Sequence, residues 1–313
     1  DAIKPKFISA QPPELLEEKD STLLYQLKNG LKLRLYTGKG LMEEKLFLTT
    51  GSPEFTEAFL KSFPSLKFSK ESKDDETVFV NVKIPSILPC LRESGSIIEK
   101  AKKNSLPNLI QPEDVKGLIH SHSNWSDGVN TIEEMANELI KKGYEYLVIS
   151  DHSKSAFYAN GLTEERIKDQ HRYVDELNSK LKPFKIFKSI ECDILNDGSL
   201  DYSDKVLSSF DLVITSVHSN LKMTEEKAMT RLMKAIENPY TIILGHMTGR
   251  LLLSRNGYPV DHKKIIDACA KNHVVIELNA HPRRLDMDWK YIDYTTEKEV
   301  LISIDPDAHA LEG

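Results

Sequence analysis

Histidine and carboxylate residues recur at the ends of apolar runs in the second part of this chain. The stretch GLIHSHSNWSDG (117–128) places two histidines and an aspartate directly after such a run. Imidazole and carboxylate groups together suit Zn, Mn or Fe, and the chain has no set of thiolates that would indicate a structural zinc site. Taken alone, this stretch fits a polar loop as well as it fits one edge of a metal site.

The elements that would position these groups follow a regular order after residue 116. Nearly continuous Val, Ile and Leu runs alternate with helical patterns, which indicates parallel strands buried on both faces. Seven such units predict an α/β fold with a closed or nearly closed (β/α) barrel, and an open doubly wound sheet stays possible. The absence of a glycine-rich phosphate loop after the first run disfavours a dinucleotide fold. The expected strands are 117–120, 146–150, 185–191, 211–218, 241–246, 273–281 and 300–305, and the expected helices are 131–143, 163–181, 224–237, 260–272 and 286–299.

Nine candidate ligands lie at or just after the carboxyl ends of six of these strands. In a parallel barrel those ends share one mouth, so their side chains converge. Each residue has an ordinary explanation by itself, such as a hydrogen-bonded loop histidine, an ion pair, or a turn or helix-capping aspartate at Asp127. Those explanations would have to hold independently at every strand end. We therefore predict a metal cluster formed by His120, His122, Asp127, His152, Glu191, His218, His246, Asp307 and His309.

Nine ligands exceed what one ion needs. At about three or four protein ligands each, they suit two or three divalent ions (Mn, Zn or Fe), and Glu191 is well suited to bridge two of them. Clustered dications generate hydroxide near neutral pH and clamp a phosphoryl group. The predicted chemistry is metal-dependent hydrolysis of a phosphoester.

Charge and composition separate two regions. Residues 1–116 hold 18 Lys and Arg against 17 Asp and Glu, whereas residues 117–313 hold 24 against 31 and all ten histidines. The net charge of −6 argues against a protein wrapped in nucleic acid. No apolar run approaches the roughly 20 residues that span a bilayer, and the start has no signal-peptide pattern. Three widely spaced cysteines favour a reducing, cytoplasmic setting.

The first part reads as a small mixed α/β region. We expect a strand at 30–36, a strand or helix end from residue 43, and an amphipathic helix that begins near Pro53. Residues 69–76 have the composition of a solvated loop, and two prolines in 84–93 argue against a long helix there. Proline and polar residues in 101–116 indicate a linker.

Residues 117–313 resemble a PHP domain, the polymerase-and-histidinol-phosphatase family. The resemblance rests on the His-x-His start, the following SDG, the DH after the second strand, the strand-end Glu, two single histidines and a terminal Asp-x-His. It implies a distorted seven-stranded, TIM-like barrel with three metal ions. By that resemblance the ions would be held by His120, His122, Glu191 and Asp307; by Glu191, His218 and His246; and by Asp127, His152 and His309.

The resemblance is closer to the PHP domain of bacterial family X DNA polymerases. It is carried by DHSKSAFYANGLTEERI (151–167), GHMTGRLLLSRNGYPVD (245–261) and NAHPRRLDMDW (279–289). Before them, LTTGSPEFTEAFLKS (48–62), IPSILPCLRE (84–93) and LPNLIQPEDVKG (106–117) resemble that family's thumb and connector. This implies a partial palm/thumb-like region at 1–100, a linker at 101–116 and a PHP domain at 117–313. It also implies a 3′–5′ exonuclease or phosphodiesterase acting on single-stranded or gapped DNA ends, Mn-dependent in many members.

Two departures from that family concern polymerisation. The finger region and most of the palm are absent, and Lys32 aligns where the family places its third metal-binding aspartate. A lysine does not bind a divalent cation as a carboxylate does, so we do not expect nucleotide polymerisation by this chain. The chain lacks an initial Met and the helix that follows the last ligand in the family, so we expect a piece of a longer protein.

Further residues near the expected mouth are candidates for substrate contacts. Arginine forks suit phosphate oxygens, although an ordinary surface ion pair is the simpler explanation for each. Aromatic rings there would stack on bases or pack within loops. Cys192 should face away from Glu191 along its strand, into the core, and His281 is not needed as a ligand. The phosphate candidates are Arg250, Arg283 and Lys154, followed by Arg284 and Ser153, and the stacking candidates are Trp125 and Tyr158.

Three functions stay open from the sequence. The first is the exonuclease, which the thumb-like residues 40–100 favour, although they carry no strong basic stripe. The second is the same chemistry on a small phosphomonoester, as in histidinol phosphatase. The third is a DNA-binding scaffold whose metals stabilise the barrel, against which the full set of candidate ligands argues.

Overall fold

The computed structural model describes residues 13–19, 22–28, 30–37, 42–72 and 74–311. The chain divides into two compact units, Asp1–Leu109 and Ile110–Gly313, and this boundary falls inside the segment expected as a linker. Among the described residues, no helix has both the length and the apolar character that crossing a membrane requires.

The first unit combines a small antiparallel sheet with short helices. Its strands β1 (Glu14–Lys19), β2 (Thr22–Gln26) and β3 (Lys32–Tyr36) pair in that order. The helices are α1 (Met42–Thr50), α2 (Pro53–Ser62), α3 (Glu76–Asn81) and α4 (Ser96–Lys102). Its core is built from aromatic rings and aliphatic side chains, chiefly Phe47, Phe55, Phe59, Phe79 and Ile98.

Three of the expectations for this unit are confirmed and one is resolved. The strand at 30–36 is β3, and the helix from Pro53 is α2, where the Ser52 hydroxyl accepts a hydrogen bond from the Phe55 N–H at 3.0 Å. Residues 84–93 form only a single 3₁₀ turn, Pro89–Leu91. The segment from residue 43, for which a strand was one option, is helical (α1) because Phe47 packs into the same core as α2.

The second unit is a nearly closed barrel of seven parallel strands. They lie in the order β10-β9-β8-β7-β6-β5-β4. The last strand returns to the first, since the His122 N–H donates to the Ala308 carbonyl at 2.8 Å and Ser121 bridges Ala308. The predicted barrel is thus confirmed and the open sheet is wrong. The strands are β4 (Gly117–Ser121), β5 (Tyr146–Ile149), β6 (Lys185–Asp193), β7 (Leu212–Ser216), β8 (Ile243–Leu244), β9 (Val275–Asn279) and β10 (Ile302–Asp305).

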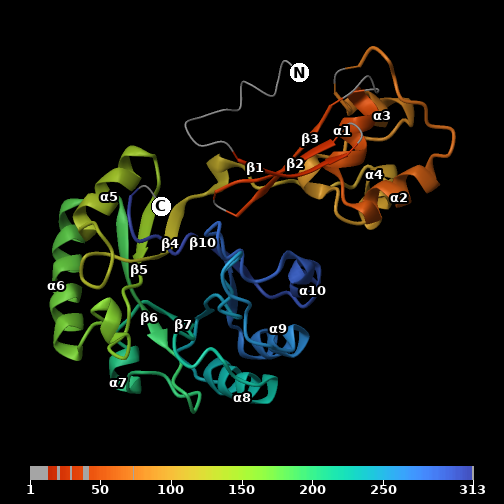
Figure 1. Ribbon diagram of the computed structural model, residues 1–313. Coiled ribbons are helices and arrows are strands. Elements are labelled where there is room, and N and C mark those ends of the chain that lie inside the picture. Colours follow the sequence, from red (N-terminus) through yellow and green to blue (C-terminus); the bar gives the residue numbers. More distant parts are fainter. Residues whose placement is uncertain (1–12, 20–21, 29, 38–41, 73, 312–313) are drawn as a thin grey trace. The chain divides into compact units, whose positions relative to one another are not determined.

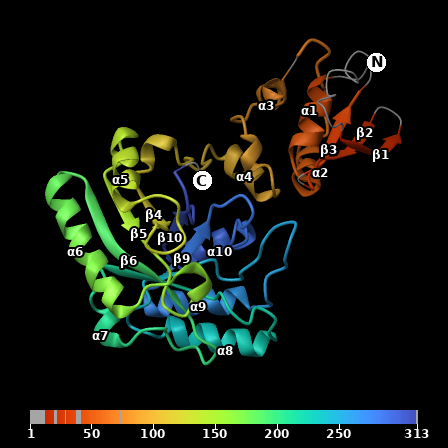
Figure 2. The same cartoon turned by 60° about the vertical axis from the view of Figure 1, so that its left-hand side comes forward.

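Helices cover the outside of these strands (Figures 1 and 2). Thr131, Thr163 and Thr224 begin three of them as N-caps, each accepting a backbone N–H in the first turn. Four expected helices are confirmed, and the fifth, 286–299, is too long. The helices are α5 (Ile132–Lys141), α6 (Glu164–Lys180), α7 (Asp204–Leu207), α8 (Glu225–Ile236), α9 (His262–Asn272) and α10 (Ile292–Glu297).

The fifth expected helix, observed as α10, is short because Asp286 is hydrogen-bonded to Thr248. Its carboxylate is buried and accepts hydrogen bonds from the N–H and hydroxyl of Thr248, at 3.0 and 2.8 Å. Its carbonyl accepts from the Asn279 N–H at 2.6 Å. Residues 286–288 therefore belong to the loop after β9, and a 3₁₀ turn, Trp289–Tyr291, precedes α10.

Strand alternation decides which side chains reach the barrel interior. Along β6, Ile190 and Cys192 are fully buried in the core cluster shared with the helices, as predicted for Cys192. Glu191 lies between them in sequence and therefore points to the opposite face, into the barrel. The strand thus delivers the Glu191 carboxylate to the barrel centre without disturbing the apolar layer.

Candidate metal centre

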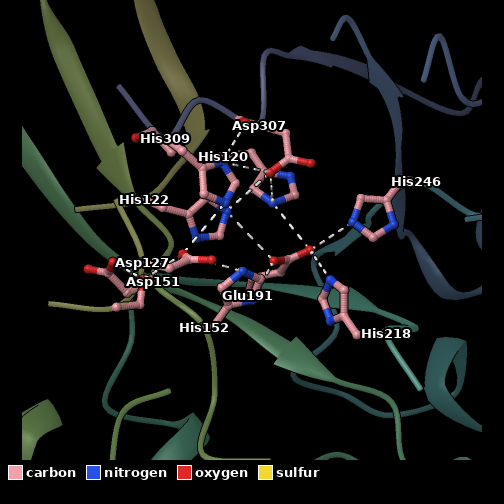
Figure 3. A network of polar contacts seen from close by, with 12 residues as sticks. His120, His122, Asp127, Asp151, His152, Glu191, His218, His246, Asp307 and His309 are labelled. Atoms are coloured by element: carbon pink, nitrogen blue, oxygen red, sulfur yellow. Dashed lines mark hydrogen bonds and ion pairs between the residues drawn. The ribbon is translucent and has the colours of Figure 1, made fainter. Parts of the chain in front are cut away.

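Glu191 is the hub of a buried cluster at the carboxyl ends of the strands. Figure 3 shows its carboxylate between His218 and His246 on one side and His122 and His152 on the other. The side chain is 0% exposed. Its two oxygens lie 2.9–3.7 Å from ring nitrogens of five histidines: His120, His122, His152, His218 and His246.

The other three predicted residues complete the cluster on the β4 and β10 side. Asp307 Oδ1 lies 3.2 Å from His122 Nε2 and 3.6 Å from His120 Nε2. Asp127 Oδ1 lies 3.7 Å from His152 Nε2 and 3.5 Å from His309 Nε2. The helix that follows is capped by Thr131, so the helix-cap explanation of Asp127 is wrong. The structure brings all nine predicted residues together.

The cluster contains overlapping groups of potential ligand atoms within 4.8 Å of one another. The group of Asp127, His152 and His309 coincides with one expected metal site and also includes His122. The group of His120, His122 and Asp307 falls within a second expected site. Two groups cut across the expected division: His120 with Glu191 and His246, and His152 with Glu191 and His218. A further group joins His120 to Glu277 and Asp305, which lie outside the predicted set.

The donor set fits cations. Several buried atoms have no hydrogen-bond partner among the described residues, including Nε2 of His120, Nδ1 of His152 and Oε2 of Glu191. Unpartnered ring nitrogens and carboxylate oxygens that face one another in a buried site are what a divalent ion would satisfy.

The charges within the cluster also favour a site for divalent ions. Burial opposes charge on Glu191, but the neighbouring histidines, His218 first, hold its pKa well below the usual range. Burial also opposes charge on His218, yet Glu191 and Asp193 raise its pKa to about 10. The protein thus keeps carboxylates ionised here and matches them with positive charge. Bound divalent ions would supply that positive charge in place of protons.

Two buried carboxylates outside the predicted set hold the histidines. One oxygen of Glu277 contacts His120 Nδ1, and the other accepts from the His246 N–H. Asp193 contacts His218 Nδ1 and accepts from the Ser155 hydroxyl. A signal for both was present, because Asp193 follows Glu191 by two residues on the same strand face and Glu277 is a lone charge in an apolar strand.

Asp151 fixes the loop that carries His122 and Asp127. Its buried carboxylate accepts from the Ser123 N–H at 2.8 Å, the Ser123 hydroxyl at 2.7 Å and the Gln170 amide at 2.6 Å. The loop then closes tightly at Gly128, where a Cβ would lie 2.1 Å from the His122 carbonyl oxygen. The turn after β4 is therefore rigid.

The phosphate-binding candidates have different surroundings. Arg250 uses its guanidinium on the carbonyls of Arg284 and Leu285 and on Asp288, which favours a structural role. The Arg283 side chain is exposed. Lys154 lies 3.7 Å from Glu164 and over the Tyr202 ring. Arg284, the weaker candidate from sequence, has its Nε 3.1 Å from Asp307 Oδ2, at the cluster.

The remaining candidates are also placed. Ser153 is buried and its hydroxyl accepts from the Asp193 N–H at 2.9 Å, so it is part of the framework. Trp125 is partly buried against the core and lies 6.4 Å from the Tyr173 ring. Tyr158 is 64% exposed. Packing explains Trp125, whereas Tyr158 is open to a ligand.

Comparison with known proteins agrees with this geometry. The profile of the PHP domain matches residues 119–281. The chain is 41% identical over 253 residues to the DNA polymerase/3′-5′ exonuclease PolX of Bacillus subtilis (strain 168), covering 81% of this chain and 42% of that protein. It is 28% identical over 169 residues to a probable phosphatase of Caldanaerobacter subterraneus, covering 51% of this chain and 60% of that protein.

A solved structure of a putative histidinol phosphatase from Listeria monocytogenes superposes with a TM-score of 0.49 at 13% identity, covering 63% of this chain and 96% of that one. A likeness of that size adds nothing to the fold described above. The chain spans less than half the length of the Bacillus relative and about three fifths of the Caldanaerobacter one. Since the family profile covers more than half of the chain and its sequence motifs meet at one buried cluster, this protein belongs to the PHP domain family.

Proposed function

We propose that this chain is a metal-dependent phosphoesterase that removes nucleotides from the 3′ ends of DNA. The observation that carries the proposal is the buried Glu191 carboxylate within 4 Å of five histidines, with Asp127, Asp307 and His309 closing the cluster. These nine residues would hold two or three divalent ions (Mn, Zn or Fe). When bound, such ions supply a hydroxide nucleophile near neutral pH and neutralise phosphoryl oxygens.

DNA is the proposed substrate because of the likeness to the Bacillus relative, whose name includes the 3′-5′ exonuclease activity. That likeness extends into the first unit, which we propose to be a partial palm/thumb-like region. Lys32 begins β3 there with an exposed side chain, and we infer no polymerase activity for this chain. We also propose a cytoplasmic location, because the proposed substrate is DNA.

A small phosphomonoester is the second candidate substrate. It is favoured by the likeness to the probable phosphatase, which is confined to about half of this chain. The scaffold function is disfavoured, because a purely structural role would not require nine ligands around a cluster with unpartnered buried atoms.

One experiment separates these candidates. The protein is incubated with Mn²⁺ and a 5′-labelled single-stranded oligonucleotide, and separately with histidinol phosphate. We expect a ladder of shortened 5′-labelled products that disappears in His122→Ala. Phosphate release from histidinol phosphate alone would transfer the proposal to the small substrate, and no turnover with ions confirmed bound would favour the scaffold.

We propose Arg284 as the residue that binds the substrate phosphate. Arg284→Ala is expected to lower kcat/KM about 10- to 100-fold, since a hydrogen bond to a charged group contributes about 1.5–3 kcal/mol. Arg283→Ala should have a smaller effect, and Arg172→Ala on α6, which pairs with Asp169 at the surface, is the control. An Arg283→Ala loss as large as that of Arg284→Ala would contradict the assignment.

Glu277 is expected to set metal affinity through His120 and His246. Because it contacts the His120 ring and the His246 backbone, Glu277→Gln should weaken binding of Mn²⁺ or Zn²⁺ about 10- to 100-fold, the usual effect of losing a carboxylate behind a histidine ligand. Isothermal titration of the metal-free protein measures this directly. Glu297→Gln at the exposed end of α10 serves as the matched control, and equal affinities for both variants would refute the expectation.

A further inference from the structure

Two exposed aromatic rings project from the loop that follows β5. This loop, residues 153–161, begins directly after His152 and leads into α6. Phe157 is 85% exposed and Tyr158 is 64% exposed. Their ring centroids lie 5.9 Å apart with the planes at 78°. Leaving two adjacent large rings in water costs free energy relative to burying them, and an exposed apolar patch of this kind is typical of a binding site.

The 153–161 loop is not loosely packed. Ala156, Ala159 and the following Leu162 are buried, at 0%, 1% and 0% exposure. The Ser155 hydroxyl donates to Asp193 at 2.7 Å. A Cβ at Gly161 would lie 1.9 Å from the Ser153 carbonyl oxygen, so the two ends of the loop touch. The backbone is therefore fixed, and the exposed rings are displayed by a rigid support.

The same loop is joined to the metal centre at both ends. The His152 carbonyl accepts from the Leu162 N–H at 2.8 Å, and Asn160 donates to the Trp125 carbonyl, two residues from Asp127. Partial burial and the nearby carboxylates of Asp193 and Glu191 raise the pKa of Tyr158 to about 12. Of the two rings, Phe157 is the more exposed and extends farther into solvent.

We propose that Phe157 and Tyr158 form a platform on which the bases of a single nucleic-acid strand stack while its phosphodiester lies at the metal centre. Bases stack on exposed aromatic rings with little dependence on sequence. With their planes at 78°, the two rings cannot both stack on one base in parallel, so each serves a different base or contact. A small phosphomonoester would leave the Phe157 ring uncovered. The proposal rests on the proposed function and names the groups that select a polymeric substrate.

The test compares two substrates in Phe157→Ala. One is a 5′-labelled single-stranded oligonucleotide, and the other has the same length with abasic residues at its last three 3′ positions. Loss of one base–ring stack is expected to lower kcat/KM about 5- to 150-fold on the first substrate, and at least about fivefold less on the second. Phe157→Trp should restore most of the activity. A loss of equal size on both substrates would overturn the proposal by assigning the ring to another contact. No loss on either substrate would overturn it by showing that the ring does not contribute.

Binding without cleavage gives an independent readout. A 2-aminopurine base near the 3′ end loses fluorescence when it stacks, and we expect this quenching with the His122→Ala protein but not with His122→Ala/Phe157→Ala. Leu301→Ala is the matched control, because Leu301 is 72% exposed but immediately precedes β10, at the opposite end of the barrel. Equal quenching by His122→Ala and by His122→Ala/Phe157→Ala would contradict the stacking proposal. An absence of cleavage by the wild-type chain would instead count against the proposed function.

Discussion

Glu191→Gln is expected to lower the rate of phosphodiester cleavage by about 10³-fold or more. The substitution keeps the shape of the side chain and removes the charge that faces five histidines. Several kcal/mol of charge stabilisation depend on correctly held ions, and each 1.36 kcal/mol is tenfold in rate. An amide also binds a divalent cation less well than a carboxylate, so the ions themselves should be lost.

Metal content therefore has to be measured together with the rate. We expect mass spectrometry of the purified variant to find fewer ions per chain than in the wild type. Glu176→Gln on the exposed surface of α6 is the control for a general effect of removing a negative charge. A Glu191→Gln protein that retains all its ions and its rate would show that the cluster is organised around another residue.

The barrel and the cluster were predictable for the same physical reason. Parallel strands buried on both faces must be apolar, so a histidine or carboxylate at the end of such a run stands out in the sequence. His218 and His246 each follow a short apolar run, and their meeting point follows from the parallel direction of the strands. The strand ends therefore predicted the members of the cluster, whereas two groups of neighbouring ligand atoms join residues that the expected metal sites keep apart.

The supporting residues were harder to predict because their partners are distant in the chain. Glu277 meets His120 across 157 positions, and Arg250 finds its acceptors in residues 284–288. Adjacent residues also separate sharply, since Arg284 reaches Asp307 while the neighbouring Arg283 side chain is exposed. These outcomes depend on loop conformation. Side-chain type alone indicates an affinity for phosphate but not the direction in which an arginine points.

Local patterns failed where tertiary contacts compete with helix propensity. Residues 286–288 continue a helical pattern in the sequence, but the buried Asp286–Thr248 hydrogen bonds hold them in a loop. The opposite occurred at residue 43, where a possible strand is helical because Phe47 completes an aromatic core. In both cases one buried side chain outweighs the preference of several neighbours.

Removing the metal ions should destabilise the second unit and leave the first unchanged. Ions that bind only the folded cluster stabilise it by about 2.7 kcal/mol each at 100 times Kd. For a unit of this size, that corresponds to a fall in Tm of about 5–10 °C for each ion removed. The large predicted effect follows from the buried, unpartnered ring nitrogens and carboxylate oxygens that remain when the ions leave.

The chain contains a natural reporter for this prediction. Both tryptophans, Trp125 and Trp289, belong to the second unit, so tryptophan fluorescence follows its unfolding alone. We expect a chelator to lower the fluorescence midpoint, and added Mn²⁺ or Zn²⁺ to restore it. Hydrogen exchange of peptides from α2 and α4 monitors the first unit, in which the described residues form no group of metal ligands. If the fluorescence midpoint does not change, the ions do not bind the folded cluster in preference to the unfolded chain, which would contradict the prediction.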